Sequence, residues 1–233
     1  MKRECYYTAN MKMADLLDTD YKLLLLLSRF DIELGFGEQT IAKSCEDHGI
    51  APELFLMICN IYSYNNYIPT EQDINSLDVH QLISYLKKSH QYYLENRVNE
   101  IAELMQVVIS QSEKVHGDVL TRFFKEYRKE VLNHFNYEEE IVFPYILGVA
   151  DGKKSAEYQI QLFEENHTNI EDKINDLKNI LIKYLPGQST SEARTNLLFN
   201  LFDLEVDLDK HTLIEELVLV PKVRNMEKHY DSK

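Results

Sequence analysis

The sequence contains one short motif twice: a histidine, three intervening residues, two adjacent glutamates, four further residues and a proline. One copy, HFNYEEEIVFP, begins at His134, and the other, HTLIEELVLVP, begins at His211. The first glutamate of each copy, Glu138 or Glu215, follows its histidine by four residues, so the two side chains share one face of a helix. Imidazole nitrogens combined with carboxylate oxygens suit Fe, Mn or Zn. The repeated motif therefore predicts metal binding.

Each copy of the motif is preceded by another histidine at the same distance. His90 and His167 each lie 44 residues before the motif histidine (134 − 90 and 211 − 167). This equal spacing indicates a duplicated helical hairpin, and antiparallel packing would bring the side chains to one layer from four helices. The predicted metal ligands are His90, His134, Glu138, His167, His211 and Glu215.

A dinuclear centre accounts for all six side chains, because two carboxylates can bridge two ions while two histidines cap each ion. A single ion would leave some of them unused. The alternative for one His-x-x-x-Glu segment is an ordinary pair between successive helical turns. The duplication favours the metal centre, since six polar groups at one level of a helical core would otherwise be costly to bury.

The other motif residues are expected to have structural roles. Glu139 and Glu216 point about 140° away from the ligand face of a regular helix. We expect a solvated position for both, with contact to a metal ligand as the alternative. Pro144 and Pro221 predict bends or ends of their helices just beyond the metal layer.

Four long segments with helical spacing of apolar residues must position these ligands. They span 79–110, 117–148, 155–187 and 191–223. Gly117 and Gly148 are expected to bound the second segment. The short breaks between segments are typical of an up-down-up-down four-helix bundle, and no stretch alternates with period two long enough to predict a strand. The predicted fold class is all-α.

Residues 1–70 are expected to form a separate small domain of three helices. The first helix is predicted within 11–30, the second follows the capping residue Thr40, and the third begins at Pro52. A polar linker, YIPTEQDINSLD, then leads to the bundle, which is predicted over 78–228.

Composition excludes several classes of partner. The net charge is −14, the pI is about 5.0 and no Lys/Arg cluster is visible, so no nucleic acid is expected to bind. The longest apolar run, LLLLL, is too short to span a membrane, and the N-terminus has no apolar signal core, which favours a cytoplasmic location. Cys5, Cys45 and Cys59 form no CxxC pair, so free buried thiols are expected, with a disulfide or thiolate metal site as the alternative.

The order and number of histidines distinguish between families of metal-binding bundles. Ferritin-like proteins use Glu-x-x-His and carboxylate-rich sites, whereas this chain resembles the hemerythrin-like fold, with Glu215 in place of a later histidine. Four histidines and two glutamates behind a small helical domain resemble the repair of iron centres family over nearly the whole chain. The segment 33–55 is similar to that family's N-terminal domain, but its paired cysteines are absent and only Cys45 remains. A thiol-dependent role of this domain is therefore not expected.

The resemblance implies a non-haem di-iron protein, with two Fe ions that are oxo- or hydroxo-bridged. It implies repair of iron–sulfur clusters damaged by nitrosative or oxidative stress, through iron donation or nitric oxide chemistry. Iron–sulfur proteins would be the iron recipients, and the gases NO and O2 the small-molecule partners; Zn or Mn are the alternative metals. Reversible O2 or NO binding or sensing is the main alternative function, and reduction of nitric oxide or peroxide is another. A docking or dimerising role of the N-terminal domain, giving a homodimer, also remains open.

Overall fold

The computed structural model describes residues 6–153, 158–166, 171–186 and 191–231. These residues form helices and turns, and their only β-type pairing is an isolated bridge between Lys12 and Thr40. The predicted all-α class is confirmed. Within the same residues, no helix has both the length and the apolar character needed to cross a bilayer. Contacts group the chain into two compact units: Met1–Ser89 with Tyr145–Ile160 and Lys210–Lys233, and His90–Pro144 with Gln161–Asp209.

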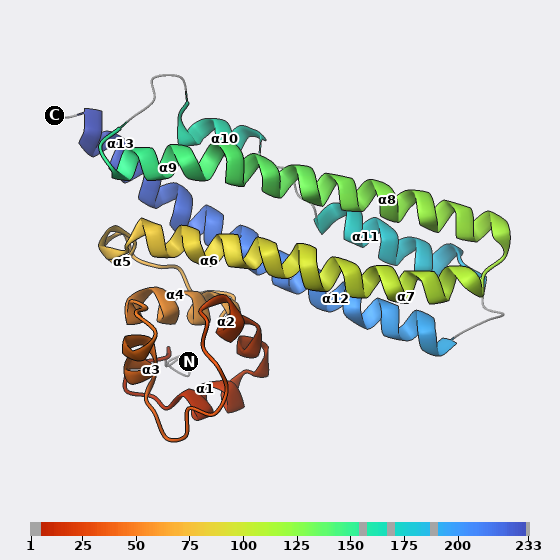
Figure 1. Cartoon of the computed structure of the whole chain (residues 1–233), viewed down its shortest axis with the longest axis horizontal. Coiled ribbons are helices and arrows are strands. Elements are labelled where there is room, and N and C mark those ends of the chain that lie inside the picture. The colour runs from red at the N-terminus through yellow and green to blue at the C-terminus, as the bar shows by residue number, and fades with distance from the viewer. Residues whose placement is uncertain (1–5, 154–157, 167–170, 187–190, 232–233) are drawn as a thin grey trace. The chain divides into compact units, whose positions relative to one another are not determined.

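The second unit contains four long helices that pack side by side (Figure 1). They are α7 (Val98–Ser110), α8 (Lys114–Tyr137), α11 (Glu171–Asn179) and most of α12 (Ser191–Ile214), together with most of the short α10 (Ile160–Asn166). Along α8, buried side chains recur every three or four residues, as at Leu120, Phe124 and Tyr127. All four long helices contribute such faces to one hydrophobic cluster, and burial of these faces stabilises the bundle.

Gly117 and Gly148 lie inside helices and do not bound the second long segment as predicted. Gly117 is in the first turns of α8, and a Cβ atom there would lie 3.3 Å from the Ile109 side chain of α7. Gly148 is in α9 (Phe143–Ala150), where a Cβ would lie 3.1 Å from the carbonyl oxygen of Lys153. Close approach of neighbouring chain, rather than helix termination, therefore explains both glycines.

The first unit contains the N-terminal helices and the ends of the long ones. Its helices are α1 (Met13–Thr19), α2 (Leu24–Arg29), α3 (Ile41–Asp47), α4 (Pro52–Ser63), α5 (Glu71–Ser76), most of α6 (Val79–Gln91), most of α9, and α13 (Val220–Asp231). Thr40 caps α3 by accepting a hydrogen bond from the Lys43 N–H, and Pro52 begins α4, as the sequence predicts. The domain boundary between residues 70 and 78 stays a prediction.

The first predicted helix is divided at Asp20. Its carboxylate accepts a hydrogen bond from the Lys22 N–H and begins a 3-10 turn between α1 and α2. The same carboxylate accepts a hydrogen bond from the Ser63 hydroxyl at 2.7 Å. Aspartate side chains compete with helical hydrogen bonding in this way, so the chain turns where the apolar pattern continues.

The predicted polar linker is wrong in part, because it contains α5. Thr70 and Asp73 form a reciprocal cap, in which each side chain accepts a hydrogen bond from the other residue's backbone N–H at 3.2 and 3.3 Å. The threonine followed three residues later by an acid was the sequence signal for this helix. Ile74 is its buried anchor.

Within the described residues, the long helices contain π-helical segments. These are Tyr92–Arg97, Glu138–Val142, Ile180–Tyr184 and Glu215–Leu219. Two of them begin at the first glutamate of the repeated motif. The Phe143 N–H bonds to the carbonyl of Glu138, five residues back instead of four. The Val220 N–H bonds to Glu215 in the same way. Such segments often occur at functional positions.

A proline follows each of these two π-helical segments after one residue. Pro144 lies in α9 and Pro221 lies in α13, so neither proline ends its helix. In a regular helix the proline ring clashes with the carbonyl four residues earlier. The wider π-helical turn gives the ring room, which explains why the helices continue.

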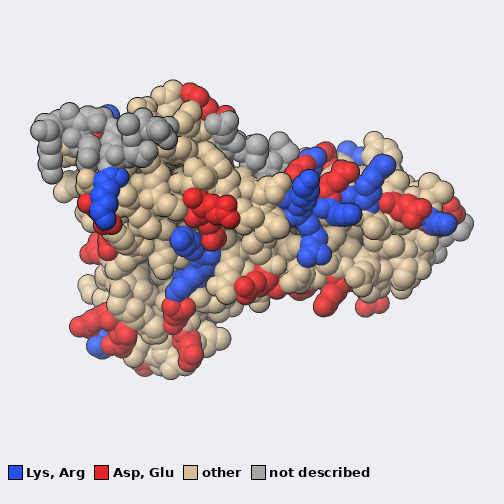
Figure 2. Space-filling view, turned by 45° about the horizontal axis from the view of Figure 1, so that its top comes forward, with Lys and Arg blue, Asp and Glu red and all other residues tan. Residues whose placement is uncertain are grey.

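On the face shown in Figure 2, Lys and Arg side chains are interspersed with Asp and Glu. Among the described residues, several cations form ion pairs, such as Lys43 with Asp47 at 2.8 Å and Lys173 with Glu130 at 3.3 Å. Exposed pairs of this kind contribute little stability.

Candidate metal centre

The first copy of the motif places two ligand candidates on one helical face. His134 lies near the end of α8, and Glu138 begins the π-helical segment that follows. The His134 Nε2 atom lies 3.0 Å from Oε1 of Glu138. The Glu138 side chain is fully buried, and that of His134 is 8% exposed.

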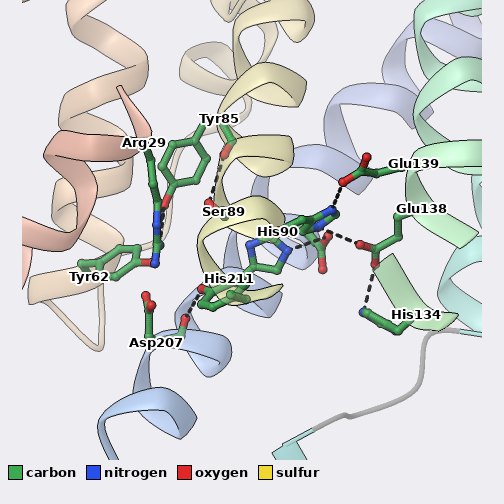
Figure 3. Close-up of polar contacts among 12 residues, drawn as sticks. Arg29, Tyr62, Tyr85, Ser89, His90, His134, Glu138, Glu139, Asp207 and His211 are labelled. Carbon is green, nitrogen blue, oxygen red and sulfur yellow. Dashed lines mark hydrogen bonds and ion pairs between the residues drawn. The ribbon is translucent and has the colours of Figure 1, made fainter. Parts of the chain in front are cut away.

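His90, near the end of α6, meets both glutamates of the same motif. Its Nε2 atom lies 3.0 Å from Oε2 of Glu138, and its Nδ1 atom lies 2.9 Å from Oε1 of Glu139. Figure 3 shows the imidazole between these two carboxylates. Of the two roles considered for Glu139, the contact with a ligand candidate is the observed one. Sequence spacing could not select this role, because the contact is made to another helix.

In the second copy of the motif, which lies in the first unit, the histidine and the first glutamate are also close together. On α12, the His211 Nε2 atom lies 3.4 Å from Oε1 of Glu215. The exposed fraction of the side chain is 2% for His211 and zero for Glu215. His167, the fourth predicted histidine ligand, lies outside the described residues. Glu216 is exposed, which agrees with the solvated position expected for it.

Each unit contains a histidine–glutamate pair that can contribute to a metal site. The carboxylate is fully buried in both pairs, which are His90 with Glu138 in the second unit and His211 with Glu215 in the first. An ionised carboxylate is very costly to bury unless a cation compensates its charge. Two fully buried carboxylates among imidazoles therefore fit a metal ion, and this donor set suits iron, manganese or zinc. The roles of the individual residues as ligands stay predictions.

The remaining described histidines contact their own helices or helix caps, and His80 also lies 3.7 Å from Asp151, which follows α9. The Nδ1 atoms of His48 and His229 lie 2.7 Å from the carbonyls of Ser44 and Asn225, four residues earlier. His80 contacts Asp78, and His116 lies 3.8 Å from Glu113.

Cys45 and Cys59 are free and fully buried in the first unit, which confirms the expectation for these two residues. Cys5 lies outside the described residues. Burial raises the pKa of Cys45 to about 12, and it raises that of Cys59 well above its ordinary value. The thiolate, which is the reactive form, is therefore disfavoured at both positions.

We expect both buried thiols to be inert in the folded protein at pH 8. In a Cys5→Ser background, a chromogenic disulfide reagent should react with neither thiol until urea is added, and then with both. Folding raises the pKa of these thiols, so their protonated form stabilises the folded protein. This stabilisation is fully present below pH 9 and is lost as the pH rises towards about 12. Rapid reaction without urea would show that these cysteines are accessible and would reopen a thiol-dependent role.

Comparison with known proteins agrees with the geometry. Iron-sulfur cluster repair protein ScdA of Staphylococcus haemolyticus (strain JCSC1435) is 24% identical over 174 residues, which cover 71% of this chain and 77% of that protein. Residues 81–223 match the hemerythrin HHE cation binding domain. The two similarities confirm the predicted resemblance to the repair of iron centres family. Because the domain match spans more than half of the sequence, this chain belongs to the hemerythrin HHE cation-binding family.

Proposed function

We propose that this chain is a non-haem di-iron protein that takes part in the repair of iron–sulfur clusters. The observation that carries this proposal is that both copies of the motif bury their first glutamate against histidine: Glu138 beside His90 and His134 in the second unit, and Glu215 beside His211 in the first. The name of the similar protein, iron-sulfur cluster repair protein ScdA, supports the choice of cluster repair among the functions open to such a centre.

The contacts of Glu138 support two ions rather than one. Its two carboxylate oxygens face different imidazoles, with Oε2 3.0 Å from His90 and Oε1 3.0 Å from His134. A carboxylate placed in this way can bridge two ions, each of which has one of these histidines as a further ligand. In the proposed centre, Glu215 is the second bridge, and His211 and His167 complete the set.

Bound iron would supply redox chemistry and open coordination positions for nitric oxide or dioxygen. The protein's own contribution is the choice of donors. Neutral imidazoles hold ferrous iron less tightly than an all-carboxylate set holds ferric iron, so iron in this centre can be passed on. We propose iron donation to damaged clusters, with nitric oxide chemistry at the same centre, in response to nitrosative or oxidative stress. The cytoplasmic location and the homodimer are part of this proposal.

A repair assay tests this function. Protein purified without oxygen should contain about two irons per chain, as a doubly bridged centre requires. It should restore the activity of a [4Fe–4S] enzyme inactivated by peroxide faster than the same concentration of free ferrous iron. The His134→Ala variant, which loses a candidate ligand, should contain less iron and restore less activity.

The assay also separates the alternative function. If the iron-loaded protein gives no recovery beyond that of free ferrous iron, but binds nitric oxide or dioxygen reversibly, cluster repair is excluded. A reversible gas carrier or sensor then becomes the function. Full iron content in His134→Ala would instead contradict the assignment of His134 as a ligand.

A further inference from the structure

The His90 imidazole is stacked against two aromatic rings. The Phe135 and Phe143 rings stack against it with centroid distances of 4.1 and 5.5 Å and interplanar angles of 14° and 15°. The His90 side chain is fully buried. Two nearly parallel aromatic neighbours fix the plane of the ring. They do not determine where the ring nitrogens lie, because a half-turn about the Cβ–Cγ bond keeps the plane of the ring but exchanges Nδ1 with Cδ2 and Nε2 with Cε1.

Glu139 supplies the missing constraint. Its Oε1 atom lies 2.9 Å from Nδ1 of His90, whereas Glu138 is reached by the other ring nitrogen (Figure 3). An ionised carboxylate can only accept a hydrogen bond, so Nδ1 must carry the proton that is donated. In neutral imidazole the lone pair then belongs to Nε2, the nitrogen that lies 3.0 Å from Glu138.

We propose that Glu139 is a positioning residue that fixes the orientation and tautomer of His90 and strengthens its Nε2 atom as a metal donor. The inference rests on the proposed metal centre but concerns a residue that is not itself a ligand. A carboxylate hydrogen-bonded to a metal-bound histidine raises the basicity of the ring, and loss of such a partner typically weakens metal binding 10–100-fold.

Two variants of Glu139 and one neighbour test the role. Glu139→Ala removes the acceptor, whereas Glu139→Gln keeps an acceptor oxygen but removes the charge. Glu140→Gln removes the same charge one residue further on, at an exposed position. We expect the weaker of two zinc dissociation constants, measured by competition with a chelator, to rise about 10–100-fold in Glu139→Ala. The rise should be smaller in Glu139→Gln, and Glu140→Gln should behave like the parent protein.

A spectroscopic readout distinguishes positioning from a loss of folding. In the zinc-loaded parent protein, nitrogen NMR should show His90 bound through Nε2, with a strongly hydrogen-bonded proton on Nδ1. This proton resonance should lose its downfield shift in Glu139→Ala and keep part of it in Glu139→Gln. If Glu139→Ala does not fold, the zinc affinity and the His90 signals of Glu139→Gln test the positioning role instead.

The outcomes separate this inference from the proposed function. If the parent binds no metal, the proposed centre itself fails. If the parent binds zinc, but the Glu139 variants keep its affinities and the same His90 signals, only the positioning role is overturned. An equal loss of affinity in Glu140→Gln would also overturn it, because local charge rather than the His90 contact would then be responsible.

Discussion

In the proposed dinuclear centre, replacing Glu138 with glutamine should release both metal ions. The substitution keeps the volume of the side chain but removes the charge and one oxygen donor. Glu138 contacts both His90 and His134 at 3.0 Å, so a Glu138 that bridges two ions would be a ligand that both ions lose. We expect affinity to fall more than about 100-fold for both ions, beyond the loss typical of an outer hydrogen-bonding partner. Iron and zinc per chain after desalting measure the effect.

The metal-free proteins provide the control for folding. A buried carboxylate is costly without a compensating cation, so metal-free Glu138→Gln should be at least as stable to urea as the metal-free parent. Glu140→Gln, at an exposed position, should retain both ions. If Glu138→Gln keeps one ion at full affinity, Glu138 serves a single ion and the bridging role is wrong.

Replacing Arg29 with alanine should strongly destabilise the first unit. The Arg29 side chain is 1% exposed, its Nη1 atom donates to the Tyr62 hydroxyl at 2.6 Å, and the Tyr85 hydroxyl lies at 3.5 Å. The substitution removes the buried guanidinium, takes a hydrogen-bond donor from the Tyr62 hydroxyl and leaves a cavity between α2, α4 and α6. We expect a loss of about 3–5 kcal/mol in the free energy of unfolding, as for other large buried side chains replaced by alanine. For a chain of this size that lowers Tm by roughly 10 °C.

Urea unfolding of the metal-free protein measures this loss without a contribution from bound ions. Arg122→Ala is the matched control, because Arg122 is exposed on α8. Its effect should stay within about 0.5 kcal/mol. A loss below about 1 kcal/mol in Arg29→Ala would show that the guanidinium does not hold these helices together.

The long helices were predictable because burial follows the helical period over many turns. In α8, Leu120, Phe124 and Tyr127 continue to Val131 and Phe135 on one face. Short helices lack that signal. The six residues of α5 bury only Ile74, so its capping residues were the sole indication. The break at Asp20 was not predicted, because apolar residues continue on both sides of it and suggest one uninterrupted helix.

The site was predictable where the relevant distance lies along one helix. Four-residue spacing places His134 beside Glu138 and His211 beside Glu215, and both contacts are present. The role of Glu139 was not determined by spacing, because it depends on the approach of α6. The sequence predicts the face of a helix on which a side chain lies, but it does not predict which residue of another helix that side chain contacts.

The π-helical segments Glu138–Val142 and Glu215–Leu219 constrain how relatives of this chain can change in length. A turn closed by a five-residue hydrogen bond holds one residue more than an α-helical turn, so a one-residue deletion there would leave a continuous α-helix. Elsewhere in these helices the same deletion would rotate every later side chain by about 100° and expose buried residues. Single-residue gaps among relatives are therefore expected to cluster between the first glutamate of the motif and its proline.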